Sequence, residues 1–405
     1  MNNSGVQDLH SHDSEKFRLE VRNWLETNCP PLMRTPGGTN EVVWGSSQVE
    51  FSSNDQRLWF ERMRDRGWFA PDWPAEFGGG GLNVEQVAIL SQEMSRMKCR
   101  APQINLGMWM LGPVLLELAS DEQKRRFLVP MARGEVRWCQ GFSEPNAGSD
   151  LASLKTAARD AGDHFVISGS KIWTSGGDKA DWMYALVRTD SKAPKHQGIS
   201  LLLLDMKSPG VSVRPIALMS GASEFCQVFF DDVRVPKENL IGPLNGGWSV
   251  AKKLLQHERA AISKLGELNL PNQVDFLPTV RRLLGKMRTP GTTAIRMRAS
   301  ICAMDDHVYQ LTMLRMSQEA NVGKDVSGIS SIAKLVHTEL EQRKSAVMID
   351  VLGDHGLGWE GRPFLPEQLR YTRQWLLNYC LSIGGGTSEI QLNIIAKRIL
   401  GLPGA

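Results

Sequence analysis

Residues 138–150 carry the sequence Trp138-Cys139-Gln140-Gly141-Phe142-Ser143-Glu144-Pro145-Asn146-Ala147-Gly148-Ser149-Asp150, and the periodicity of the chain changes at this stretch. Before it, apolar residues recur at helical spacing, as Phe17, Val21 and Trp24 do. After it come short apolar runs that glycine and proline separate, a pattern typical of an antiparallel sheet. We therefore predict strands at residues 164–168, 182–187, 199–205, 211–216 and 228–230.

Helical periodicity returns after these strands. The chain thus divides into an N-terminal helical domain at residues 1–137, a β domain at residues 138–242 and a C-terminal helical domain at residues 243–405. Glycine-rich breaks are expected between the C-terminal helices at residues 246–247, 285–293 and 323–328. The expected fold class is α+β, because helices and strands are segregated along the chain.

Composition and charge argue against several classes of protein. The 405 residues, 41% of them hydrophobic and 22% charged, are typical of a globular protein with more than one domain. A net charge of only +3 without a basic block argues against nucleic-acid binding. No apolar run approaches the roughly 18 residues of a membrane span, and the polar residues 1–12 lead us to expect no secretion signal. The six scattered cysteines include no CxxC pair, so we expect no disulfide, no metal site and a cytoplasmic location.

A second informative stretch lies near the C-terminus and reads Ile383-Gly384-Gly385-Gly386-Thr387-Ser388-Glu389-Ile390-Gln391. It runs into a helix-like segment that continues to Leu400. We predict that Ser388 and Gln391 form a capping box at the start of this helix. A glycine loop that enters the N-terminus of a helix is suited to bind an anion such as a pyrophosphate.

Together these two stretches resemble the signature segments of the acyl-CoA dehydrogenases, flavoproteins that desaturate acyl-CoA thioesters. The resemblance covers essentially the whole chain. It implies the family's architecture, in which an N-terminal helical domain and a β-barrel-like domain sit on a C-terminal four-helix bundle. It also implies FAD as the cofactor, an acyl-CoA as the substrate and an electron-transfer flavoprotein as the electron acceptor.

Several residues are expected to contact the flavin. The glycines of the first stretch would let the backbone approach a planar ligand, and its short polar side chains would bind it. A third stretch, residues 169–177, resembles the family's Gly-x-Lys-x-Trp-Ile-Thr-Asn-Gly segment. By that match Trp173 lies beside the isoalloxazine ring, and Ser175 hydrogen-bonds its reactive nitrogen. By resemblance Thr387 and Glu389 contact the diphosphate and adenosine portion. The expected cofactor-binding residues are Gln140, Phe142, Ser143, Gly148, Ser149, Trp173, Ser175, Thr387 and Glu389.

The catalytic base departs from the pattern of many relatives. They carry Tyr-Glu-Gly-Thr in the second stretch, with the glutamate as base, and Gly385 stands in its place here. In isovaleryl-CoA dehydrogenase and bacterial steroid side-chain dehydrogenases, the glutamate instead lies on an early helix of the C-terminal domain, directly before an arginine. Glu258 and Arg259 occupy that place, so we assign Glu258 as the base and expect Arg259, with Ser149, to bind substrate.

The position of Glu258 on its helix supports this assignment. At about 100° per residue, Glu258 falls in the apolar stripe that contains Ala251 and Leu255, whereas His257 points away from it. A carboxylate placed there loses hydration, so its pKa should rise toward the working range of a general base. The structural alternative is a buried glutamate that pairs with Arg259.

Two further departures concern the subunit interface. The family's Arg-x-x-Phe-Gly element is absent from residues 268–293, and its Gln-x-x-Gly-Gly element has become Asp350-Val351-Leu352-Gly353-Asp354-His355-Gly356. Both elements normally reach FAD across that interface. Similar departures occur in steroid-degrading relatives that assemble as heterotetramers. A homodimer, a homotetramer and a heterotetramer with a related subunit therefore all stay open.

We expect FAD-dependent α,β-dehydrogenation of an acyl-CoA thioester. A backbone N–H at Gly385 and a ribityl hydroxyl would hold the thioester carbonyl, and Glu258 would take the α-proton. Gly384 and Gly385 delete two side chains where relatives confine the acyl chain, which favours a bulky, branched, cyclic or steroid side-chain acyl group unless Trp375 or Leu377 refills the space. The alternatives are a non-catalytic subunit that completes a partner's FAD site and a flavin monooxygenase on the same fold.

Overall fold

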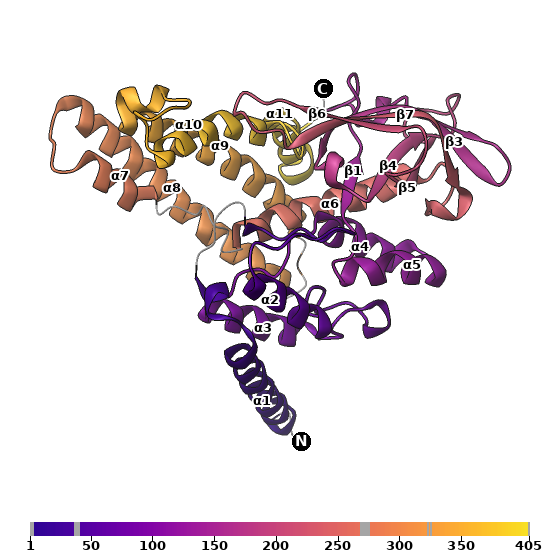
Figure 1. Cartoon of the computed structure of the whole chain (residues 1–405), viewed down its shortest axis with the longest axis horizontal. Helices are drawn as coiled ribbons and strands as arrows, with labels where there is room; N and C mark the ends of the chain where they lie inside the picture. The colour runs from indigo at the N-terminus through magenta and orange to yellow at the C-terminus, as the bar shows by residue number, and fades with distance from the viewer. Residues whose placement is uncertain (1–3, 36–40, 268–275, 322–323, 325, 404–405) are drawn as a thin grey trace.

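The computed structural model describes residues 4–35, 41–267, 276–321, 324 and 326–403. A cluster of helices at the N-terminal end, a β-sheet and a long helical arm follow one another along the chain (Figure 1). The fold class is α+β, as expected. The N-terminal helices are α1 (Ser4–Asn28), α2 (Asn54–Asp65), α3 (Val84–Arg96), α4 (Leu106–Leu118) and α5 (Asp121–Ala132).

The middle of the chain forms one eight-stranded sheet in the order β6-β7-β3-β2-β4-β5-β8, with β1 beside β4. Each predicted strand lies within an observed one, and three short strands were missed because two to four residues carry little periodicity. The strands are β1 (Trp138–Gly141), β2 (Ala157–Asp160), β3 (His164–Ser175), β4 (Trp182–Arg188), β5 (Ile199–Asp205), β6 (Val211–Ile216), β7 (Phe225–Pro236) and β8 (Leu240–Ile241).

The sheet is not wholly antiparallel, contrary to the expectation. Strand β1 runs parallel to β4, with Trp138 opposite Trp182 and Gln140 opposite Tyr184. Parallel pairing is permitted because a long connection that contains β2 and β3 joins the two strands, where a tight hairpin would force them to be antiparallel. This register places the side chains of Gln140 and Tyr184 next to each other.

The C-terminal helices are arranged around one long helix. Helices α6, α7, α8 and α10 all contact α9. A helix begins within each predicted glycine-rich break: α6 at Gly247, α8 at Pro290 and α9 at Ser327, so the breaks are shorter than predicted, and residues 323 and 325 of the third lie outside the described residues. The helices are α6 (Gly247–Glu267), α7 (Phe276–Leu284), α8 (Pro290–Asn321), α9 (Ser327–Leu352), α10 (Pro366–Asn378) and α11 (Ser388–Ile394). None of the described helices is both long and apolar enough to cross a membrane.

Close contact between α6 and the sheet determines where the side chains of α6 lie. A Cβ atom on Gly247 would come within 2.6 Å of the backbone of Ser200 in β5, so only glycine permits this approach. Val250, Ala251 and Leu254 continue the contact and are buried in the core that joins the N-terminal helices to the sheet. Helix α6 is therefore held against the sheet over its first two turns, and Glu258 follows one turn later.

Candidate active site

Helix α6 and strand β1 meet at a carboxylate. The side-chain amide of Gln140 in β1 donates from Nε2 to Oε2 of Glu258 over 3.4 Å, although the two residues are 118 positions apart in the chain. Glu258 is half-buried on the face of α6 that also carries Ala251 and Leu254. One residue expected at the flavin and the residue expected to be the base are thus in direct contact.

A buried tyrosine extends this contact into the sheet. The Tyr184 hydroxyl donates to Oε1 of Gln140 at 2.9 Å, and only 1% of the Tyr184 surface is exposed. Burial raises the pKa of Tyr184 well above its ordinary value, and the nearby carboxylate of Glu258 raises it further. Sequence reasoning missed Tyr184, and the available signal was a hydroxyl-bearing residue within the apolar run of β4.

The glycine turn before α11 is held by two side chains. Lys334 on α9 donates from Nζ to the carbonyl oxygen of Gly386 at 2.6 Å, and Gln391 donates to the carbonyl oxygen of Gly385 at 2.9 Å. Gly385 and Gly386 have φ angles of 67° and 88°, in the left-handed region that favours glycine. The turn therefore has a defined shape that side-chain-bearing residues would adopt only with strain.

The predicted capping box at Ser388 is wrong by one residue. The N-cap of α11 is Thr387, whose side chain accepts a hydrogen bond from the backbone N–H of Ile390. The amide of Gln391 reaches back to Gly385, so it does not cap the helix. The reason is that the positive φ of Gly386 turns the chain before Thr387, which leaves Thr387 as the first residue able to cap. The exposed Glu389 lies in the first turn, where backbone and Thr387 hydrogen bonds lower its pKa.

Lys334 connects the glycine turn to the carboxylate on α6. Its ammonium group is buried, which lowers its pKa, while the carboxylates of Glu258, Glu339 and Glu389 act in the opposite direction. Glu258 is therefore close enough to Lys334 to interact electrostatically with it, and Lys334 in turn contacts the turn at Gly386. Lys334 therefore links the turn expected to bind the carbonyl to the residue expected to be the base. Sequence reasoning also missed Lys334.

A buried ion pair shapes the loop after β1. Nζ of Lys171, which is fully buried, lies 2.8 Å from Oε1 of Glu144 and donates to the carbonyl oxygen of Phe142 at 3.1 Å. Glu144 also accepts hydrogen bonds from the backbone N–H groups of Lys155 and Thr156. Burial lowers the pKa of Lys171 to about 8. Burial alone would raise the pKa of Glu144. Lys171 and the N–H donors outweigh this effect, so the pKa of Glu144 is lowered. This pair holds Phe142 and, through the Ile172 N–H to Ser143 carbonyl bond, the neighbouring Ser143.

Trp173 is presented to solvent by an irregularity in β3. The pairing of β3 with β7 shifts between Lys171 and Thr174, and Trp173 has a φ of 61°. Its indole is 54% exposed and meets the ring of Phe225 edge-on, with centroids 6.2 Å apart. Large side chains rarely adopt this backbone conformation, and such strain gathers at ligand sites. Ser175 is also exposed, at the end of the same strand.

Family models match the chain in three consecutive blocks. The model described as the N-terminal domain of acyl-CoA dehydrogenase matches residues 11–135, the middle-domain model matches residues 139–233, and the C-terminal-domain model matches residues 245–400. The chain belongs to the acyl-CoA dehydrogenase family.

Curated relatives of this acyl-CoA dehydrogenase include mycobacterial and mammalian acyl-CoA dehydrogenases. It is 33% identical to acyl-CoA dehydrogenase IpdE1 of Mycobacterium tuberculosis, over 96% of this chain and 98% of that protein. It is 37% identical to FadE34 of the same organism over 84% of this chain, but the match spans only 45% of that protein's length. Solved structures agree: the Tcur3481-Tcur3483 steroid ACAD has a TM-score of 0.74 at 26% identity, over 97% of this chain and 98% of that one. The ChsE4-ChsE5 complex from Mycobacterium tuberculosis has a TM-score of 0.71 at 30% identity, over 97% and 98%.

Some residues that the sequence assigned to the site of this dehydrogenase lie away from the contacts described above. Gly148 and Ser149 are exposed on the loop after β1, and a Cβ atom on Gly148 would meet nothing within 4 Å. The side chain of Arg259 lies outside the part of the chain that the structure describes. No group of three or more potential metal ligands occurs among the described residues.

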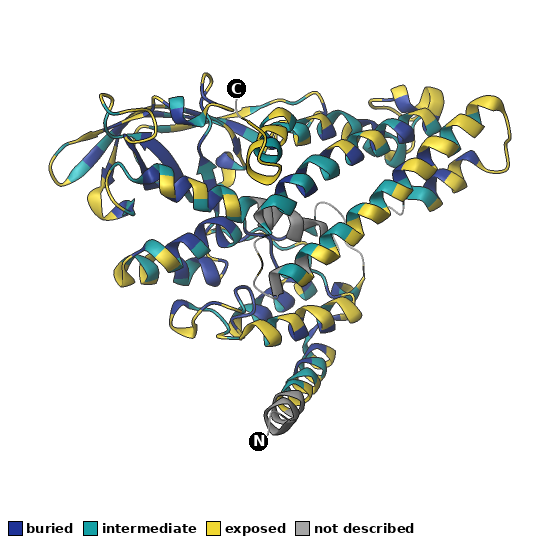
Figure 2. Ribbon diagram, turned by 180° about the vertical axis from the view of Figure 1, so that it is seen from behind, coloured by how far each residue is buried: buried dark blue, intermediate teal, exposed yellow. Residues whose placement is uncertain are grey.

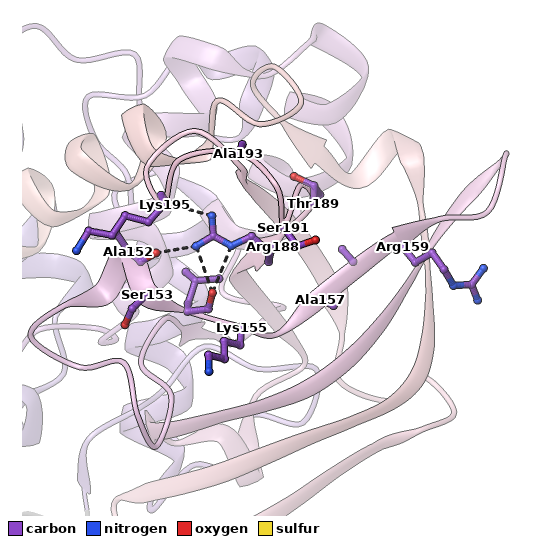
Figure 3. A pocket seen from close by; sticks show the side chains of 12 residues that line it. Ala152, Ser153, Lys155, Ala157, Arg159, Arg188, Thr189, Ser191, Ala193 and Lys195 are labelled. Atoms are coloured by element: carbon purple, nitrogen blue, oxygen red, sulfur yellow. Dashed lines mark hydrogen bonds between the residues drawn. The ribbon is translucent and has the colours of Figure 1, made fainter.

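A separate hollow of about 600 Å³ lies beside the sheet of this dehydrogenase, between β2 and the connection from β4 to β5 (Figure 3). The guanidinium of Arg188 donates to the carbonyl oxygens of Ala152, Leu154 and Lys195, which ties the walls of the hollow together. None of the residues expected at the active site lines it. The hollow is therefore separate from the contacts around Glu258.

Proposed function

We propose that this protein is an FAD-dependent acyl-CoA dehydrogenase in which Glu258 removes the α-proton of the substrate. The observation that carries the proposal is the hydrogen bond from Gln140 to Glu258, because it joins a half-buried carboxylate to the segment expected to bind the flavin. Position 385, where many relatives have the base, is a glycine in a turn and cannot abstract a proton. Glu258 is thus the acceptor that the site offers.

The residues present fit a bound FAD. An exposed indole on strained backbone, an exposed serine two residues later and a loop held by a buried ion pair offer a flat surface with polar contacts. We assign Phe142, Ser143, Trp173 and Ser175 to the isoalloxazine. The pyrophosphate and adenosine contacts of Thr387 and Glu389, and the roles of Gly148 and Ser149, remain predictions from the sequence. FAD would supply the acceptor for the hydride that leaves the β-carbon.

The residues of this chain perform the proton chemistry. The α C–H bond breaks, its proton passes to the carboxylate of Glu258, and its electron pair moves toward the thioester carbonyl. The turn at Gly385, fixed by Lys334 and Gln391, would aim a backbone N–H at that carbonyl and stabilise the developing negative charge. Partial burial of Glu258 limits the water that competes for its proton-accepting oxygen.

Anaerobic titration of the purified holoenzyme with acyl-CoA esters tests this function. Bleaching of the visible flavin absorption, with release of the enoyl-CoA product, is the expected result. A flavin monooxygenase would consume oxygen and would not be bleached by acyl-CoA alone. A non-catalytic subunit would show no bleaching with any ester unless a partner subunit were added. Either result would overturn the proposal.

We expect a preference for bulky acyl groups. A Cβ atom on Gly384 would meet nothing nearer than the carbonyl oxygen of Cys380 at 3.7 Å, and neither Trp375 nor Leu377 comes within 4 Å of that position. A straight short chain would leave contacts unmade, at about 0.8 kcal/mol for each methylene that stays unburied. The measurement is kcat/KM for butyryl-CoA, octanoyl-CoA and a steroid side-chain CoA ester, of which the last should be highest. A clear preference for butyryl-CoA would contradict the prediction.

We also infer that the chain assembles through α8. Exposed apolar residues recur along one face of this helix. Seen from behind, α8 carries exposed positions along its length (Figure 2). They are Met297, Ile301, Met304, Val308 and Leu311, at the three- and four-residue spacing of a helix that packs against another. One structural relative named above is the ChsE4-ChsE5 complex, which makes a related subunit the proposed partner. An electron-transfer flavoprotein is the proposed electron acceptor.

Light scattering tests the assembly. The wild-type protein, alone or co-expressed with a related subunit, should be a dimer or tetramer. Met304→Lys places a charge in the apolar face and should yield a smaller species. Lys324→Met, an exposed change beyond the end of α8, serves as the matched control and should leave the mass unchanged. A Met304→Lys variant with unchanged mass would show that α8 is not the interface.

A further inference from the structure

Strands β1 and β4 place two polar side chains side by side behind Glu258. Gln140 lies opposite Tyr184 in the parallel register of the two strands, and both side chains point toward α6. The Tyr184 ring is buried and meets the ring of Phe142 edge-on, with centroids 5.9 Å apart and planes at 87°. Packing therefore fixes the tyrosine hydroxyl, and the hydroxyl meets one end of the Gln140 amide.

The chemistry of these groups selects one orientation of the amide. An ionised carboxylate only accepts hydrogen bonds, so it requires the NH₂ end of Gln140. With Nε2 toward Glu258, the carbonyl end of the amide faces Tyr184 and accepts from its hydroxyl. A flipped amide would set its carbonyl oxygen against the carboxylate and leave the hydroxyl proton of Tyr184 without this acceptor. Each hydrogen bond therefore enforces the other.

We propose that Tyr184 and Gln140 are positioning residues that hold Oε2 of Glu258 so that Oε1 receives the α-proton. The inference rests on the proposed function of Glu258 and names the groups that orient it. Before the reaction the amide binds one oxygen of the carboxylate. When the α C–H bond breaks, the proton goes to the other oxygen, and the bond from Gln140 Nε2 persists to the carbonyl oxygen of the neutral acid.

The charged groups around Glu258 determine how the hydrogen bonds from Tyr184 to Gln140 and from Gln140 to Glu258 affect the pH dependence of the reaction rate. We call these two bonds the relay. Lys334 from α9 and Tyr184 from β4 interact electrostatically with the carboxylate, and Glu339 and Glu389 interact electrostatically with Lys334. On α4 the carboxylate of Glu117 is paired with Lys253 on α6, nearer the start of the helix. The Gln140 donor stabilises the charged form of Glu258, so its removal should raise the pKa of the base. The acidic limb of the pH–rate profile should then move to higher pH.

Three variants of the holoenzyme test the relay by anaerobic flavin reduction with saturating acyl-CoA over a range of pH. Gln140→Met keeps the side-chain length without donor or acceptor, and should slow reduction on the order of 10-fold to 100-fold, with the acidic limb raised by about one pH unit. Tyr184→Phe should also slow flavin reduction and raise the acidic limb of the pH–rate profile, but by a smaller amount. The double variant should resemble Gln140→Met alone, because both residues act through one hydrogen bond to Glu258. Tyr371→Phe removes a hydroxyl that bonds Glu367 on α10, so it is the control and should change neither.

The readouts separate this inference from its alternatives. A merely structural role would change flavin content or protein yield without moving the acidic limb. If Gln140→Met loses its flavin, Tyr184→Phe becomes the deciding variant. The hydroxyl that this change removes bonds the end of the Gln140 amide that faces away from Glu258. Wild-type rates and an unshifted limb in Tyr184→Phe would overturn the relay. Failure of the proposed function would look different: Glu258→Gln would stay active, or no acyl-CoA would reduce the wild-type flavin.

Discussion

Glu258→Gln should lower the rate of flavin reduction by acyl-CoA by on the order of 10³-fold or more, while the protein retains its FAD. Glutamine keeps the volume of the side chain and can still bond Gln140, but its amide cannot take up a proton at neutral pH. The loss should appear in the reduction rate constant, because proton abstraction belongs to that step. Stopped-flow reduction under anaerobic conditions, with the flavin content measured for each preparation, provides the measurement.

Glu360→Gln is the matched control for this change. Glu360 is an exposed carboxylate of the same helical domain, so its replacement removes one negative charge from the surface of the protein. Its reduction rate should equal that of the wild-type protein. If Glu258→Gln kept more than about a tenth of wild-type turnover, a different residue would have to be the base.

Lys171→Met should destabilise the protein by about 3–5 kcal/mol and release FAD, because it leaves the carboxylate of Glu144 buried without its cation. Lys171 also donates to the carbonyl oxygen of Phe142, so the loop expected to face the flavin loses its anchor. Glu144 has a lowered pKa in the folded protein despite its burial; without Lys171 the burial would dominate and the pKa would rise. Urea denaturation and the flavin-to-protein absorbance ratio measure the two effects.

Two further variants check the cause of this effect. The double variant Glu144→Gln/Lys171→Met removes both charges while the glutamine oxygen can still accept from the N–H groups of Lys155 and Thr156, so it should regain part of the lost stability. Lys237→Met breaks an exposed pair with Asp160, which should cost at most about 1 kcal/mol. Equal losses from Lys171→Met and Lys237→Met would contradict a structural role for the buried pair.

Apolar periodicity and glycine breaks predicted much of the fold, because the preference of a segment for helix, strand or turn depends mostly on its own residues. Four consecutive leucines from Leu201 belong to β5, which is buried on both faces, and α6 begins at the glycines 246–247 as expected. The prediction failed where one residue's backbone angle decided the outcome. The positive φ of Gly386 moved the cap of α11 from Ser388 to Thr387, and no periodicity encodes such an angle.

The sequence by itself determined the family, the order of helices and strands, and Glu258 as the candidate base, because glycine at position 385 leaves no carboxylate there. Only the tertiary structure decided what surrounds Glu258. Gln140 from β1 contacts the carboxylate, Tyr184 from β4 bonds Gln140, and Lys334 from α9 interacts with the carboxylate electrostatically, although these residues are far apart in the chain. Such contacts depend on the parallel register of β1 with β4 and on the close approach of Gly247 to β5. Both are set by packing between elements, which the local spacing of residue types does not record.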